Sequence, residues 1–143
     1  MTRQEALRRL PLRLTAGAFM LNSGFGKVGA DKSAAEQLHG FAAATYPVLG
    51  KVEPEVFAKA LSAAEVVTGV ALLVPFVPTV VAGICLTAFS TGLIGMYLKT
   101  PGMRKQGSLR PTEQGIALAK DVWLLGIGLS LAFDGLTRTG GRR

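Results

Sequence analysis

A long apolar stretch occupies the middle of the chain, from Leu61 to Leu98, and Glu65 is its only charged residue. A single straight helix of that length would measure about 57 Å at roughly 1.5 Å per residue. The hydrocarbon core of a bilayer is only about 30 Å thick. The central Pro75-Phe76-Val77-Pro78 segment interrupts the stretch, because each proline lacks an N–H donor and obstructs the preceding turn. The pattern therefore predicts two membrane-spanning helices joined by a tight turn.

Two further apolar segments flank this stretch, one near each end of the chain. The whole pattern predicts four spans over residues 10–29, 57–76, 79–98 and 115–136. A second interpretation of the first segment exists, because a basic start, a short apolar core and the small residues Val28-Gly29-Ala30 are also typical of a cleavable signal peptide. With later spans in the same chain, a first transmembrane helix is the favoured interpretation.

The connection between the first two spans has a character of its own. Ser33 to Tyr46 is rich in alanine and weakly amphipathic, which is typical of a helix lying at the membrane–water interface. Pro47 should end that helix, and Pro54 suits the first turn of the next one. The expected fold is therefore all-α: a single domain over residues 1–143, built as a membrane four-helix bundle with a short interfacial helix in the first connection.

Composition supports a membrane protein and excludes several functions. Hydrophobic residues make up 49% of the 143 residues and charged residues only 17%, below the roughly 25% usual in soluble domains. The net charge of +7 lies mainly at the termini and in the loop at residues 99–114. This suits lipid head groups, so the bilayer is an expected partner and nucleic acid is not. The single cysteine, Cys85, and the single histidine, His39, predict no metal site and no haem.

Small residues recur at helical spacing on two of the spans. Ala58, Ser62, Glu65 and Gly69 fall on one narrow face of the second span, which should face the bundle because a carboxylate facing lipid is costly. The third span repeats small residues at every fourth position, which is the strongest helix-packing signal in the sequence. This ladder consists of Gly83, Thr87, Thr91 and Gly95. It is expected to pack helices within the chain, although pairing between two copies in a homo-oligomer is a second option.

The alternation of four spans places the charges that lie within them. We call the side of the N-terminus side A and the opposite side B. Lys27 ends the first span at side B, Glu65 enters with the second span, and Lys120 and Asp121 enter with the fourth. Two cations and two anions form a neutral set, so we predict a polar cluster of these four residues near side B. Two roles remain open for it: fixing the helices in register, or binding a small polar or quinone-like ligand.

Several motifs of the chain resemble the DoxX family of small bacterial and archaeal membrane proteins. The resemblance rests on Arg13 at the start of the first span, on Gly24-Phe25-Gly26-Lys27 at its end, and on the segment from Glu65 to Leu73 with its glutamate followed by Gly69. It implies a four-span protein of the inner (cytoplasmic) membrane. The family takes its name from a small subunit of a membrane quinone oxidoreductase complex.

This resemblance implies an accessory or anchoring subunit of a membrane redox or respiratory assembly, without a catalytic residue of its own. The alternative is a small carrier or quinone-binding protein that uses the polar cluster. The sequence shows no nucleophile–base pair, metal site or phosphate loop, so no enzyme activity and no bound cofactor are predicted, and a quinone would enter only through the resemblance. Basic residues are equally numerous on both sides, and because the first helix often decides the orientation we expect both termini in the cytoplasm.

Overall fold

The computed structural model describes the backbone of residues 3–140 and the side chains of residues 4–137, and it is helical over most of that length. Its helices, in chain order, are α1 (Arg3–Lys27), α2 (Lys32–Thr45), the 3₁₀ helix η1 (Pro47–Lys51), α3 (Pro54–Leu73), α4 (Thr79–Lys99), α5 (Ile116–Ala119) and α6 (Val122–Gly140). The described residues form no β-strand, so the predicted all-α class is confirmed.

Three helical segments are long and apolar enough to cross a membrane, which makes this a membrane-embedded protein. They are Pro54–Leu73, Thr79–Lys99 and Ile116–Thr137. Their exposed surfaces carry large apolar side chains such as Val67, Ile84 and Phe133. Helix α1 is longer than these, with 25 residues, but is not among the three apolar segments. Its first half carries Arg8, Arg9 and Arg13, which lower its hydropathy.

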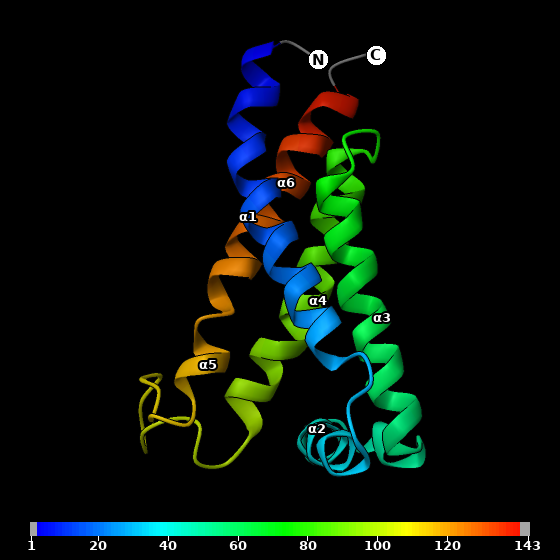
Figure 1. Cartoon of the computed structure of the whole chain (residues 1–143). Coiled ribbons are helices and arrows are strands. Elements are labelled where there is room, and N and C mark those ends of the chain that lie inside the picture. Colours follow the sequence, from blue (N-terminus) through cyan, green and yellow to red (C-terminus); the bar gives the residue numbers. More distant parts are fainter. Residues whose placement is uncertain (1–2, 141–143) are drawn as a thin grey trace.

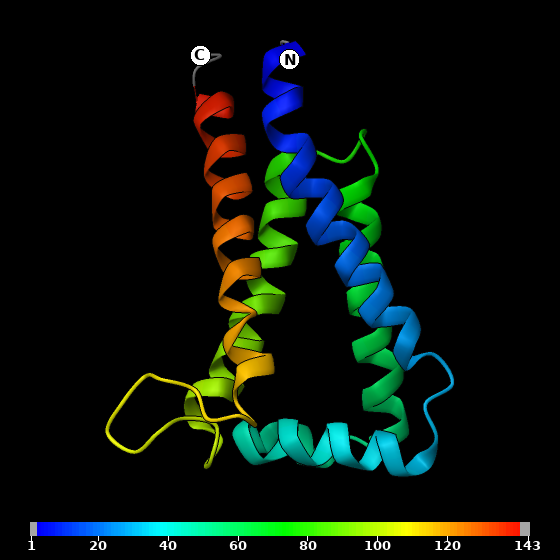
Figure 2. The same cartoon turned by 60° about the vertical axis from the view of Figure 1, so that its left-hand side comes forward.

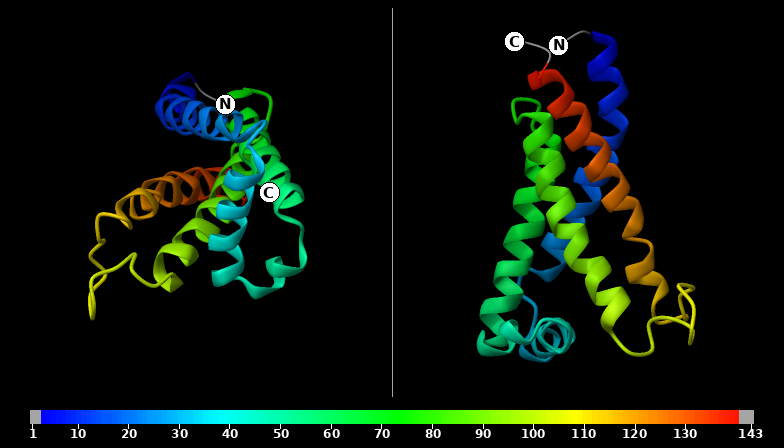
Figure 3. Two further views of the ribbon diagram at one scale, coloured as in Figure 1. Left: turned by 60° about the horizontal axis from the view of Figure 1, so that its bottom comes forward. Right: turned by 180° about the vertical axis from the view of Figure 1, so that it is seen from behind.

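The long helices alternate in direction, and the two ends of the chain lie at the same end of the molecule (Figure 1). They form two pairs, α1 with α3 and α4 with α6, and these pairs make most of the contacts between helices. Seen from behind, α4 lies between α3 and α6 (Figure 3). The two pairs diverge toward side B, where α2 lies crosswise beneath them (Figure 2). The structure is therefore closed at side A and spread at side B.

Glycines allow α1 and α3 to approach each other closely. A Cβ atom added at Gly69 would lie 2.9 Å from the backbone nitrogen of Leu21 and 3.0 Å from the carbonyl oxygen of Gly17. One added at Gly24 would lie 3.0 Å from the backbone nitrogen of Val66. The predicted inward face of α3 is confirmed, because its four members are all buried.

The second pair uses the same device, and part of the predicted ladder belongs to it. A Cβ atom at Gly83 would lie 2.4 Å from the backbone nitrogen of Ala132, and one at Gly128 would lie 2.7 Å from that of Thr87. Gly95 instead faces Tyr46, whose hydroxyl donates a hydrogen bond to the Gly92 carbonyl (2.9 Å). Thr91 is exposed and bonds only within its own helix, so the ladder serves two interfaces and leaves this member free of both.

Two predicted helix limits are wrong at the side-A end. The first helix begins at Arg3 instead of residue 10 and carries Pro11 inside it. The second span ends at Leu73 instead of residue 76, because Val74 already leaves the helical conformation ahead of Pro75. The predicted limits around the first connection hold: α2 ends at Thr45 before Pro47, and Pro54 stands in the first turn of α3.

Candidate ligand site between the helix pairs

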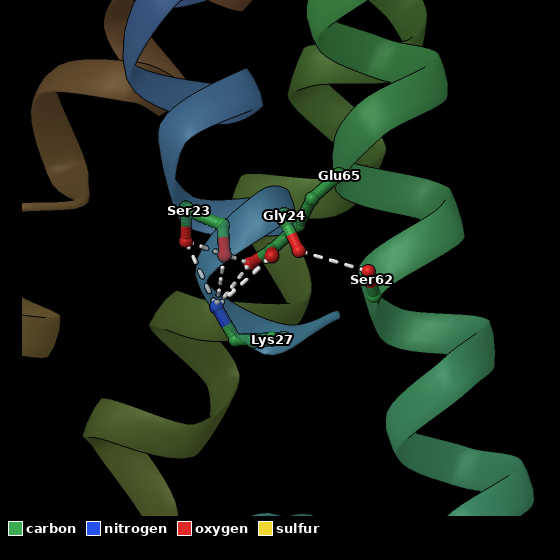
Figure 4. Close-up of polar contacts among 5 residues, drawn as sticks. All are labelled: Ser23, Gly24, Lys27, Ser62 and Glu65. Atoms are coloured by element: carbon green, nitrogen blue, oxygen red, sulfur yellow. Dashed lines mark hydrogen bonds and ion pairs between the residues drawn. The ribbon is translucent and has the colours of Figure 1, made fainter. Parts of the chain in front are cut away.

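The side-B cluster, as we call Ser23, Lys27 and Glu65, joins the side-B end of α1 to the middle of α3 (Figure 4). The Lys27 ammonium donates to both carboxylate oxygens of Glu65, at 3.0 and 2.9 Å. The Glu65 side chain is 5% exposed and that of Lys27 is 21% exposed. A buried carboxylate needs such a partner, since an unpaired charge in a medium of low dielectric constant is costly. The structure thus places these two residues of the predicted cluster in direct contact.

Hydroxyl groups complete the cluster. Ser23 donates to Glu65 at 3.1 Å, and its own hydroxyl and carbonyl oxygens accept from Lys27 at 2.9 and 3.2 Å. One turn below Glu65, Ser62 donates to the carbonyl oxygen of Gly24 at 2.8 Å. The Lys27 ammonium thus has four oxygen acceptors at hydrogen-bond distance, enough for all three of its N–H donors.

A cavity of about 400 Å³ opens beside this cluster, between the two helix pairs and above α2. Its wall is mainly apolar, with Phe19 of α1, Phe41 of α2, Phe57 of α3 and Phe89 of α4 among the lining residues. Lys27, Glu65 and Asp121 are the charged residues that line it. A concave, mostly apolar pocket with a few polar groups is the usual form of a small-molecule site.

Asp121 lines the same cavity from the opposite helix pair. It stands where α5 ends and α6 begins, and the helical hydrogen bonding is interrupted at Lys120 and Asp121. Its carboxylate makes no hydrogen bond and no ion pair with any side chain in the described part of the chain. The structure therefore places three of the four predicted cluster residues around one cavity, but only two of them are paired.

Lys120 does not join the cluster, and the prediction for it is wrong. Its side chain is exposed, and it lines a second hollow of about 550 Å³ on the outer side, between α1 and the start of α6. Adjacent residues of a helix point about 100° apart, so Lys120 turns away when Asp121 faces the cavity. Which of the two faces inward depends on the rotation of this helix, and the sequence pattern left that rotation undetermined.

A second polar region at the other end of the bundle was not predicted as a cluster. We call Arg9, Arg13, Thr79 and Asp134 the side-A network. Arg13 reaches from α1 to the end of α3 and donates to the carbonyl oxygens of Ala71, Leu72 and Val74 at 2.9, 2.6 and 2.8 Å. The last carbonyls of a helix have no partner within the helix. The guanidinium group supplies that partner and also opposes the negative end of the helix dipole.

Arg9 extends this network to the other helix pair. It is 8% exposed, pairs with the carboxylate of Asp134 on α6, and donates to the hydroxyl of Thr79 at the start of α4 (3.0 Å). Arg13 also donates to the Val77 carbonyl in the turn between α3 and α4 (3.2 Å). Counting helix directions would have indicated this contact, since Asp134 lies in the side-A half of the last helix and Arg9 in the side-A half of the first.

The remaining candidate residues offer no further site. His39 Nε2 lies 2.8 Å from the carbonyl oxygen of Leu49, so it joins α2 to η1. Cys85 is partly buried in α4. Within residues 3–140, no group of three or more His, Cys, Asp or Glu side chains is arranged to hold a metal ion.

Comparison of the chain with family models, with curated proteins and with solved structures finds no match. The assignment of a function therefore depends on the geometry described above.

Proposed function

We propose that this protein holds a small amphipathic molecule, dissolved in the membrane, in the cavity between its two helix pairs. A quinone-like compound is the class that the resemblance to the DoxX family implies. The observation that supports the proposal is the cavity of about 400 Å³, with the Lys27–Glu65 pair and Asp121 in an otherwise apolar wall. The apolar wall would contact the apolar part of such a molecule, and the charged groups would bind its polar part.

The proposal places α1 in the membrane as a fourth span beside the three apolar helices. The contacts of α1 with α3, through Gly17, Gly24 and Arg13, favour an integral helix over a cleavable signal peptide. On this proposal α2, which lies crosswise at side B, rests at the membrane interface. The first helix orients the chain with both termini in the cytoplasm, in an inner membrane.

The residues on which the resemblance to the DoxX family rests occupy one region of the structure. Arg13, Gly24, Lys27, Glu65 and Gly69 all lie at the contact between α1 and α3. These residues join the two helices along their length, and two of them, Lys27 and Glu65, also line the cavity, which is consistent with a family built around this helix pair. We therefore keep a DoxX-like membrane protein as part of the proposal.

An accessory subunit of a membrane redox assembly is the second candidate, and the surface of α4 favours it. Thr91 is exposed there, and a Cβ atom added at Gly92 would have open space around it. Small residues left open on a membrane helix allow another helix to approach closely. On this candidate, the chain purified from native membranes carries a partner in fixed ratio, and replacing Thr91 with leucine removes that partner.

The main proposal is tested by the small molecules that the protein retains. The chain is purified from native membranes in mild detergent and its bound compounds are identified by mass spectrometry. Ala117→Trp fills the cavity without removing a charge, because Ala117 lines it. The control is Val67→Trp, which adds the same group to a side chain that is 63% exposed on α3. We expect a stoichiometric amphipathic compound in the wild type and in the control, and its loss in Ala117→Trp. Its absence from all three would contradict the proposal.

A further inference from the structure

The charges around the cavity do not balance. Lys27 is bonded to both oxygens of Glu65, so that pair is neutral and closed. Asp121 is left as an additional carboxylate that lines the same cavity and forms no ion pair among the described residues. Among these residues, no second cation lines the cavity besides Lys27. A carboxylate without a counter-charge inside a membrane protein is costly, so the site lacks one positive charge.

The cavity also continues toward the surrounding membrane. The outer hollow between α1 and the start of α6 shares four lining residues with the inner cavity, so Asp121 lies where the two spaces meet. The shared residues are Phe19, Ala117, Asp121 and Leu124. Trp123, which is 69% exposed, and the exposed Lys120 flank the outer space. A molecule that diffuses within the bilayer would pass between α1 and α6 and meet the carboxylate first.

We propose that the molecule held in the cavity is a lipophilic cation, which enters sideways between α1 and α6 and pairs its positive charge with Asp121. This inference rests on the proposed function, and it assigns the ligand a cationic class in place of the neutral quinone-like class that the resemblance implies. The aromatic residues of the wall suit such a compound, since the faces of Phe19, Phe57 and Phe89 attract a cation as well as an apolar body. The Lys27–Glu65 pair then acts as a neutral, fixed part of the wall.

The test measures binding of a cation and of a neutral compound of similar shape. The protein in lipid nanodiscs is titrated with the cation tetraphenylphosphonium and with two neutral compounds, triphenylphosphine oxide and decylubiquinone. Empty nanodiscs give the background. Asp121→Asn removes the charge but keeps the size of the side chain and one hydrogen-bond acceptor oxygen. Asp121→Glu keeps the charge and serves as the rescue. Glu113→Gln removes one negative charge from an exposed loop position and controls for the net charge.

We expect tetraphenylphosphonium to bind the wild type, Glu113→Gln and Asp121→Glu with similar affinity, and Asp121→Asn at least about tenfold more weakly. Equal binding of tetraphenylphosphonium to the wild type and to Asp121→Asn, with both proteins eluting as folded material, would overturn the inference. So would tight binding of triphenylphosphine oxide or decylubiquinone that is independent of Asp121, although the proposed function would then stand. If neither the cation nor the two neutral compounds bind the wild type, both proposals fail.

Discussion

The two ends of the bundle use charged residues in opposite ways. In the side-A network, Arg13 saturates its guanidinium on backbone carbonyls, and Arg9 ties α1 to α6 through Asp134. Around the side-B cavity, Lys27 and Glu65 form an ion pair, whereas Asp121 forms none with any side chain that the structure describes. The comparison shows that charge within a membrane bundle is not itself a sign of function. The informative residue is Asp121, whose carboxylate forms no ion pair among the described residues.

The largest effect is expected at Arg13. Arg13→Leu leaves the carbonyls at the end of α3 without a donor and frees the turn before α4. We expect a loss of about 3 kcal/mol in the free energy of unfolding, the order of losing several hydrogen bonds to a charged donor. The measurement is unfolding by denaturing detergent, followed by circular dichroism. Arg8→Leu is the control, because Arg8 is exposed on the same helix. Equal losses for both variants would show that the side-A contacts do not stabilise the fold.

A smaller effect is expected at Glu65. Glu65→Gln leaves Lys27 without its counter-charge, and we expect a cost of about 2 kcal/mol, since Lys27 is partly exposed and recovers some hydration. The double variant Lys27→Met, Glu65→Gln should recover part of this loss, because it removes the charge left behind. A double-mutant cycle in the same unfolding assay measures the coupling. Strictly additive losses would refute the pairing of these residues.

Thr79 tests whether the side-A network extends to α4. Thr79→Val keeps the shape of the side chain but removes the oxygen that accepts from Arg9. We expect a loss of about 1 kcal/mol, as for one buried hydrogen bond. Thr91→Val is the matched control on the same helix, because Thr91 is exposed and bonds only within α4. A control that loses as much as Thr79→Val would show that the effect belongs to helix propensity and not to the network.

The smallest effect on stability is expected at Asp121. Asp121→Asn breaks no hydrogen bond or ion pair among the described residues and removes a charge that is costly to bury. The free energy of unfolding should therefore stay within about 0.5 kcal/mol of the wild type, and any change should be an increase. The same unfolding assay checks this. A large loss would show that Asp121 stabilises the bundle and would count against its role as a ligand-binding residue.

The sequence predicted the fold more completely than the site. The proline turn at Pro75 and Pro78, the start of α3 at Pro54 and the inward face with Glu65 follow from local rules and appear in the structure. The pairing of Lys27 with Glu65 followed from counting helix directions. Helix directions did not predict that Asp121 faces the cavity and Lys120 does not. This depends on the rotation of a helix that is interrupted at these two residues. The first helix begins at Arg3 and not at residue 10, because Arg9 is buried against Asp134 and Thr79, and a charge in the sequence does not show that it has such partners.

We propose that the cavity near side B binds a ligand and that the side-A network only stabilises the fold. One experiment separates the two roles. Thermal unfolding is measured with and without tetraphenylphosphonium for the wild type, Arg13→Leu and Asp121→Asn. A ligand that binds only the folded state stabilises it by about 2.7 kcal/mol at one hundred times its dissociation constant. The account predicts that Arg13→Leu unfolds at a lower temperature but keeps the stabilisation by ligand, whereas Asp121→Asn unfolds like the wild type and loses it. The opposite assignment, or an equal stabilisation of all three proteins, would contradict the account.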